Sequence, residues 1–149
     1  HGTYVPLYVE DPVAADGRNG GRSSVLRPGQ AFNTGRYKFI KFQKEPVMVP
    51  VIRVDSLLAE GVQHFNCLNI DVQGYELPVL EGATKILDGI DYILCEVNKT
   101  QLYEKGTLVQ EIDDFLAPYG FNRVETNWIG ASWGDALYIK SNSFKEEKE

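Results

Sequence analysis

The stretch LNIDVQGYELPVLEGATKIL, residues 68–87, contains the clearest secondary-structure pattern in this sequence. It continues an apolar run that begins at residue 65, and such a run is typical of a strand covered on both faces. Gln73 and Gly74 follow as a turn. Apolar residues then recur at helical spacing. Pro78 is compatible with this helix only if it lies in the first turn. The stretch therefore predicts a strand at residues 65–72 and a helix at residues 75–87.

The same alternation continues downstream. Residues 90–97, IDYILCEV, again look like a buried strand, and residues 107–110, TLVQ, fit the capping box that begins a second helix. Residues 121–126 and 136–140 predict two final strands. A succession of strand, helix, strand, helix and strand implies right-handed crossovers. The predicted fold class is therefore α/β, with a mainly parallel sheet and antiparallel edge strands.

Upstream of this region, the pattern is β-like with wide loops. Residues 3–9, 36–42 and 47–54 are strand candidates, and Pro6 restricts the first of them to an edge or a bulge. Residues 11–35 are rich in Gly, Pro, Asn, Asp and Ser and predict a long loop. Asp55 is expected to cap a short helix that Gly61 ends. No convincing boundary divides the chain, so we expect one domain at residues 1–140 and a disordered tail at residues 141–149.

Composition excludes several classes of protein. The formal net charge is −6, and the fifteen Lys and Arg residues are scattered, so no basic stripe is available for nucleic acid. No apolar stretch approaches the roughly 20 residues that span a bilayer, and the N-terminus lacks a signal-peptide pattern. The two Cys and two His residues lack zinc-site spacing and imply no disulfide framework. We expect a soluble, cytoplasmic protein that binds neither nucleic acid nor membrane.

Two acids stand where a parallel sheet binds its ligands. Asp71 follows the first predicted parallel strand and Glu96 ends the second, and ligands of open α/β sheets bind beyond the carboxyl ends of the strands. If the two strands are neighbours, both carboxylates face one crevice. The structural alternative is that Asp71 accepts hydrogen bonds from the backbone of the turn at residues 73–76 as a cap. Glu76 is interpreted as favouring the positive end of its helix.

Other polar residues are weaker candidates. Asn98 is two residues beyond Glu96 and is either a hydrogen-bonding partner for a substrate hydroxyl or a turn residue. Ser23 and Ser24 offer adjacent hydroxyls, although no His is placed to activate them. Trp133 is explained equally by packing and by substrate contact. In an alternative reading, Asp71, Glu96 and Asp135 hold a Mg²⁺ ion through oxygen ligands.

Four blocks of the sequence form a series whose order and spacing are informative: VPVIRVDSLL at 49–58, LNIDVQGYELPVLEGATKIL at 68–87, ILCEVN at 93–98 and WGDALYIK at 133–140. Together, and in this order and spacing, they resemble the FkbM-like family of methyltransferases. The central block carries an Asp-Val-Gln-Gly-Tyr-Glu turn at residues 71–76, where the family typically shows Asp-Val-Glu-Gly-Ala-Glu. Gln73 therefore removes a carboxylate that the family pattern has.

The resemblance implies a Rossmann-like class I methyltransferase that uses S-adenosylmethionine. Such enzymes hold the cofactor with a strand, a Gly-rich turn and a helix, which we do not find here. We therefore expect that element before His1 and interpret the chain as the C-terminal portion of the domain. It remains open whether this portion alone binds the cofactor.

The same resemblance implies site roles. The acceptor is expected to be a sugar or other small polyol-like hydroxyl compound, and the protein aligns its oxygen with the activated methyl group. Asp71 is expected to act as general base, with Glu96 and Asn98 orienting the acceptor. Asp71 and Gly74 are expected to contact the cofactor. The remaining acceptor contacts are assigned to Ser23, Ser24 and Trp133.

Two other classes remain open. The chain is alternatively a non-catalytic α/β packing or binding module, or a doubly wound sugar-nucleotide or glycosyl-transfer enzyme whose acids contact ribose or metal. Neither the oligomeric state nor a metal requirement follows from the sequence.

Overall fold

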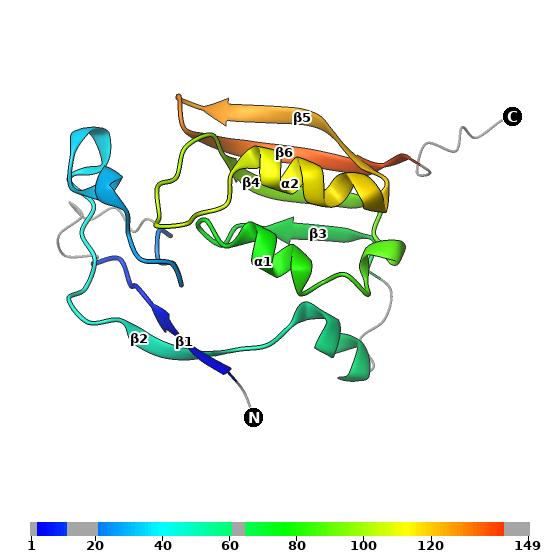
Figure 1. Cartoon of the computed structure of the whole chain (residues 1–149), viewed down its shortest axis with the longest axis horizontal. Coiled ribbons are helices and arrows are strands. Elements are labelled where there is room, and N and C mark those ends of the chain that lie inside the picture. The colour runs from blue at the N-terminus through cyan, green and yellow to red at the C-terminus, as the bar shows by residue number, and fades with distance from the viewer. Residues whose placement is uncertain (1–2, 12–20, 61–64, 142–149) are drawn as a thin grey trace, which may run out of the picture.

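A four-stranded sheet forms the centre of the molecule (Figure 1). The computed structural model describes residues 3–11, 21–60 and 65–141. Within them the strand order is β3-β4-β6-β5. The bounds are Cys67–Ile70 for β3, Tyr92–Asn98 for β4, Phe121–Ile129 for β5 and Trp133–Lys140 for β6.

The sheet is mixed, so the prediction of a mainly parallel sheet with antiparallel edge strands is wrong. Only β3 and β4 pair in parallel, whereas β6 pairs antiparallel with both β4 and β5. The physical reason is the short connection between β5 and β6, because two strands joined by a tight turn must run in opposite directions. β6 then inserts between β4 and β5, so the antiparallel strand is internal. β3, β4 and β5 still share one direction, as the alternation of strands and helices implies.

Two short α-helices cover one face of this sheet (Figure 1). They are α1 at Glu76–Glu81 and α2 at Val109–Leu116. Side chains of β4 alternate, with Ile93, Cys95 and Val97 fully buried in the core while Tyr92 and Leu94 remain 39% and 42% exposed. The prediction that this strand is covered on both faces is therefore wrong for the described chain.

Helix α1 is shorter than predicted: it ends at Glu81, and Gly82 is its C-cap residue. The chain then continues through turns to a 3₁₀ helix, η4, at Leu87–Gly89. Asp55 stabilises these turns, since its carboxylate accepts a hydrogen bond from the backbone N–H of Lys85 at 2.9 Å. Asp55 therefore connects two distant segments instead of capping η3, the 3₁₀ helix at Val54–Glu60 in which it lies.

The N-cap of α2 is Leu108, one residue later than predicted, and its apolar side chain cannot complete a capping box. Glu111 accepts a hydrogen bond from the backbone N–H of Leu108 at 2.7 Å and so caps the helix. Thr107 instead connects the two helices, because its hydroxyl accepts a hydrogen bond from the backbone N–H of Leu77 at 3.2 Å. A further 3₁₀ helix, η5, follows α2 at Ala117–Tyr119.

The N-terminal third forms a separate layer beside the sheet. β1 (Thr3–Leu7) pairs antiparallel with β2 (Val47–Val51), and Pro6 lies inside this two-stranded ribbon. The strand predicted at residues 36–42 is wrong, because η2 at Gly35–Tyr37 replaces its start. Another 3₁₀ helix, η1, spans Gln30–Phe32. A small second core of Phe32, Ile40 and Tyr103 fastens this segment to the loop after β4.

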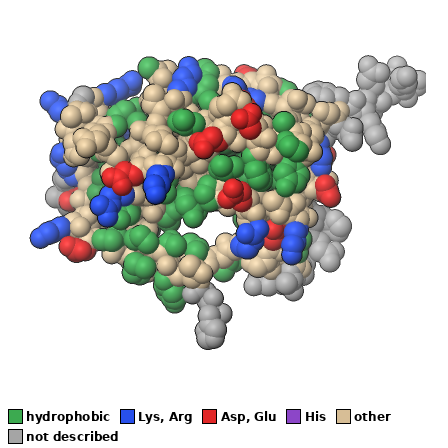
Figure 2. Space-filling model, viewed as in Figure 1, with side chains coloured by type: hydrophobic (Ala, Val, Ile, Leu, Met, Phe, Trp, Pro, Cys, Tyr) green, Lys and Arg blue, Asp and Glu red, His purple; other side chains and the backbone are tan. Residues whose placement is uncertain are grey.

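The charged side chains on the surface are as scattered as they are along the sequence. Figure 2 shows Lys and Arg side chains dispersed among carboxylates over the visible face. None of the helices in the described residues has the length and apolarity that a membrane span requires. Ser141 donates its backbone N–H to the carbonyl of Gly120, and the rest of the predicted tail, residues 142–149, lies outside the described residues.

Asp113 connects α2 to the far edge of the sheet and gives a first test of the fold. Both its oxygens accept hydrogen bonds from Arg123 at 2.9 Å, and Tyr138 donates to it at 2.8 Å. Partial burial raises the pKa of Asp113, but the bonds from Arg123 and Tyr138 outweigh burial and lower it. A lowered pKa contributes stability above the unfolded-state value, and this is lost as the pH falls through the folded-state value.

We therefore expect Asp113→Asn to destabilise the protein at pH 7 and to lose most of its effect at a pH below the lowered folded-state pKa of Asp113. Urea unfolding at both pH values measures the difference. The exposed Asp88→Asn is a suitable control. A destabilisation by Asp113→Asn that is equal at both pH values would contradict the role of this charge.

Candidate active site

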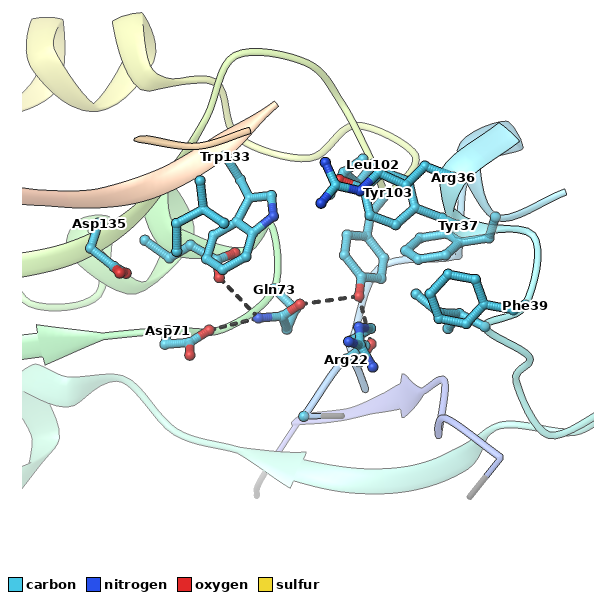
Figure 3. Close-up of a pocket in the computed structure, with 15 residues that line it drawn as sticks. Arg22, Arg36, Tyr37, Phe39, Asp71, Gln73, Leu102, Tyr103, Trp133 and Asp135 are labelled. Carbon is cyan, nitrogen blue, oxygen red and sulfur yellow. Dashed lines mark hydrogen bonds between the residues drawn. The ribbon is translucent and has the colours of Figure 1, made fainter. Parts of the chain in front are cut away.

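A cavity of about 490 Å³ lies where β3, β4 and β5 end and β6 begins (Figure 3). Its walls come from these strand ends, from the loop after β4 and from the N-terminal segment. The position agrees with the expectation that ligands bind beyond the carboxyl ends of the strands. The lining residues are Gly21, Arg22, Phe32, Arg36, Tyr37, Phe39, Ile40, Asp71, Gln73, Glu96, Leu102, Tyr103, Ile129, Trp133 and Asp135.

Asp71 and Glu96 line this cavity together. Ile70 is in register with Cys95, so the residue that follows each of them reaches the same edge of the parallel pair. The prediction that the two strands are neighbours with their acids at one rim is confirmed. The capping alternative for Asp71 is wrong, because Asp71 Oδ1 accepts a hydrogen bond from the side chain of Gln73 and not from the turn backbone.

The capping role belongs to Glu76, which is fully buried at the start of α1. Its Oε1 accepts a hydrogen bond from the backbone N–H of Gly74 at 2.9 Å. Its Oε2 is buried without a hydrogen-bond partner within the described chain. Burial raises the pKa of Glu76, against the opposing effect of backbone N–H groups. A buried carboxyl group therefore lies directly behind the acid pair.

Glu96 is the acid whose protonation is most altered. Its pKa is raised to about 7, first by burial and then by the nearby charges of Asp71 and Glu76. The hydrogen bond from Gln73 acts in the opposite direction. A carboxyl group with a pKa near neutrality exchanges a proton readily at physiological pH, which is the property that a general base requires.

Gln73 holds the acid pair together, and sequence reasoning missed this role. Its Nε2 donates to Asp71 Oδ1 at 2.7 Å and to Glu96 Oε2 at 3.3 Å (Figure 3). The single proton of the Tyr103 hydroxyl is donated mainly to the backbone carbonyl of Arg22 at 2.5 Å, and Gln73 Oε1 is a weaker second acceptor at 3.3 Å. Gln73 has a φ of 53°, a left-handed conformation that non-glycine residues seldom adopt. The available signal was the replacement of the family's Glu by Gln in this turn.

Trp133 and Asp135 also line the cavity, from the start of β6. Asp135 is in register with Glu96, and Trp133 with Asn98. Gly134 between them is in register with Trp128 of β5. Insertion of β6 beside β4 thus brings an acid and a large aromatic side chain to the same cavity as the acid pair.

The remaining predicted site residues lie elsewhere. Ser24 is buried and donates its hydroxyl to the backbone carbonyl of Gln73 at 2.8 Å, while the Ser23 hydroxyl accepts from the backbone N–H of Glu10. Both hydroxyls therefore fix the loop, and their neighbours Gly21 and Arg22 reach the cavity instead. Asn98 and Gly74 line a separate crevice that has no room for a water molecule. The Oδ1 of Asn98 is buried there without a partner in the described residues.

Gly74 has a structural reason to be glycine. Its φ is 97°, and a Cβ at this position would approach Leu26, Tyr103 and Gly106 at 3.3 to 3.4 Å. Its backbone N–H is bonded to Glu76, and its carbonyl accepts from Thr107 at 2.8 Å. The predicted contact of Gly74 with a cofactor remains a prediction.

No group of three or more His, Cys, Asp and Glu residues in the described segments is arranged to hold a metal ion. The Mg²⁺ alternative for Asp71, Glu96 and Asp135 thus gains no support. In this structure, the amide of Gln73 lies between two of these carboxylates.

Comparison with known proteins agrees with the sequence pattern. A family model described as the methyltransferase FkbM domain matches residues 2–123. Neither the curated proteins nor the solved structures gave a match. The matched segment contains the turn at residues 71–76 and both acids of the pair, whereas β6 follows it. Because the model covers most of its length, the chain belongs to the FkbM methyltransferase family.

Proposed function

We propose that the protein that carries this chain is an S-adenosylmethionine-dependent O-methyltransferase that acts on a sugar or another small hydroxyl acceptor. Family membership supports methyl transfer. The observation that carries the choice of a hydroxyl acceptor is the pair of Asp71 and Glu96, joined by Gln73 in one cavity. A neutral hydroxyl must lose a proton when its oxygen is methylated, and a positioned carboxylate accepts it.

The chemistry of the cavity fits a cationic cofactor. The negative charges of Asp71, Glu76 and Asp135 each raise the pKa of Glu96, so this end of the cavity favours positive charge. S-adenosylmethionine would supply an activated methyl group on a positively charged sulfur. Of the residues present, Asp71 is the best placed to face that charge. The strand, Gly-rich turn and helix expected for the rest of the cofactor are not seen in the described segments.

We assign the proton transfer to Glu96 and the supporting role to Asp71, the reverse of the expectation from sequence. Glu96 combines burial with a pKa of about 7. Asp71 lies on the adjacent strand end and raises the affinity of Glu96 for a proton through its charge. Gln73 fixes the distance between them. The hydroxyl of the acceptor would donate its hydrogen bond to Glu96, which takes the proton as the oxygen is methylated.

The rest of the cavity positions the acceptor. Trp133 presents aromatic surface beside the acid pair, whereas the ring of Tyr103 is buried in the second core and forms the wall behind it (Figure 3). Apolar ring faces of this kind pack against the C–H faces of sugars and exclude water. Ordering the acceptor beside the base accounts for much of the rate enhancement in such reactions.

The pH dependence of the reaction tests these roles. We expect kcat/KM for methyl transfer to rise with pH around an apparent pKa near 7, because Glu96 must be deprotonated to act. Asp71→Asn removes a negative charge that raises this pKa, so the rise should move to lower pH by about one unit. Transfer of a labelled methyl group to a panel of sugars, measured from pH 5 to pH 9, gives both profiles.

Asp88→Asn is the matched control, since Asp88 lies in η4 and does not line the cavity. Its profile should coincide with that of the wild type. An unchanged profile for Asp71→Asn would exclude the proposed coupling. Absence of methyl transfer to every hydroxyl acceptor would exclude the proposed function.

A further inference from the structure

The end of the cavity that faces the acid pair has the opposite charge. Figure 3 shows Arg22 and Arg36 on one side of the cavity and Asp71 and Asp135 on the other. Glu96 belongs to the acidic side, because Gln73 donates hydrogen bonds to both Asp71 and Glu96. A ligand that spans the cavity therefore meets carboxylates at one side and guanidinium groups at the other. Such an arrangement of charge orients a ligand so that its anionic end faces the guanidinium groups and its other end faces the carboxylates.

Arg22 is already neutralised within the protein. Its Nη1 donates to Glu10 Oε1 at 3.0 Å, and its backbone N–H donates to the other oxygen of Glu10. Its carbonyl accepts the hydrogen bond from Tyr103. Arg22 thus holds the loop in place and contributes little uncompensated charge to the cavity.

Arg36 differs, because its guanidinium has no ion pair with any residue in the described part of the chain. Guanidinium groups are preferred receptors for planar or tetrahedral anions, since their N–H groups bind two oxygens at once. Arg36 is therefore the cation of this cavity that is available to a ligand.

Arg36 lies against the turn between β5 and β6. Tyr37, the next residue, is hydrogen-bonded through its hydroxyl to Ser132 of that turn at 2.8 Å. A Cβ on Gly130 would lie 2.8 Å from Arg36 Nη1, so glycine leaves the space that the guanidinium occupies. Arg36 lines the cavity together with Tyr103 and Trp133 (Figure 3).

We propose that Arg36 binds an anionic group of the acceptor, which is a hydroxyl compound that carries a carboxylate or a phosphate. This inference rests on the proposed function and narrows its substrate class to acidic or phosphorylated sugars and similar compounds. The anion contacts Arg36, the body of the acceptor lies against Trp133, and a hydroxyl reaches Glu96. The negative charge of the acceptor is thereby kept away from the acid pair.

Binding of three sugars tests the proposal without requiring methyl transfer. The probes are methyl α-D-glucuronide, D-glucose 1-phosphate and the neutral methyl α-D-glucoside. We expect at least one anionic probe to bind about tenfold more tightly than the glucoside, with a preference that declines as salt is added. Calorimetry at low and high salt measures both, and the two anionic probes distinguish carboxylate from phosphate recognition.

Variants of Arg36 then locate the effect. Arg36→Gln should abolish the preference for the anion, and Arg36→Lys should retain part of it because the charge remains. Lys38→Gln is the control, since Lys38 is an exposed cation of the same segment that does not line the cavity. The preference of Lys38→Gln for anionic over neutral probes should match that of the wild type.

Three outcomes would overturn the proposal: equal affinity for charged and neutral probes, no binding of either anion, or a preference that survives Arg36→Gln. Other outcomes would contradict the proposed function independently of this inference. Methyl transfer to neutral sugars with no anion preference would leave the function intact and remove only this inference. An anion preference without any methyl transfer would leave the subsite and remove the function.

Discussion

Glu96→Gln is expected to lower kcat for methyl transfer by about 10² to 10⁴, which is the usual contribution of a general base. The amide keeps the size of the side chain but cannot accept the proton of the acceptor hydroxyl. KM should change much less, because the aromatic walls of the cavity are untouched. Steady-state transfer of a labelled methyl group at pH 8 measures both constants.

Measurements of stability distinguish a folded variant that lacks the base from a variant that has lost its fold. The pKa of Glu96 is raised in the folded state, so the native protein binds its proton more tightly than the unfolded chain does. The stability from Glu96 is thus fully present at low pH and is lost as the pH rises towards about 7. The free energy of unfolding of Glu96→Gln, relative to that of the wild type, should therefore rise by on the order of 1 kcal/mol between pH 5 and pH 8, allowing for solvent screening.

Glu125→Gln is the matched control for both measurements, because Glu125 is an exposed carboxylate on β5. It should leave kcat and the pH dependence of stability unchanged. A Glu96→Gln variant that is folded and retains wild-type kcat would exclude Glu96 as the base.

Gly134→Ala is expected to destabilise the protein by about 3 kcal/mol, at the upper end for overpacking of a core. Gly134 is buried in β6, and a Cβ there would collide with the carbonyl oxygen of Asn127 and lie 2.8 Å from the Cα of Trp128. These are backbone atoms of the paired strand β5, so no side chain can move aside. The midpoint of thermal unfolding should fall by about 10 °C.

The same substitution should also impair the cavity, because Trp133 and Asp135 flank Gly134 and both line it. Gly89→Ala is the control, since a Cβ there meets only the carbonyl of Phe65 at 3.8 Å. It should be neutral in calorimetry and in methyl transfer. A Gly134→Ala protein as stable as the wild type would show that β5 and β6 separate more easily than this packing implies.

The sequence by itself determined the adjacency on which the site depends. Two apolar runs separated by a helical pattern require a right-handed crossover, so β3 and β4 pair in parallel and Asp71 and Glu96 meet at one rim. The turn at residues 71–76 also identified the family. These features follow from local periodicity and short connections, which are properties of neighbouring residues.

Only the tertiary structure decided how the site is completed. The place of β6 between β4 and β5 depends on long-range pairing, and it brings Trp133 and Asp135 to the cavity. The hydrogen-bond partners of Gln73 and Ser24 come from segments distant in the chain, as does the neighbour of Arg36. Periodicity predicts which face of an element is apolar, but polar side chains take their partners from whatever packing brings within reach. For that reason the sequence located the acid pair, and the packing of the distant segments selected the residues around it.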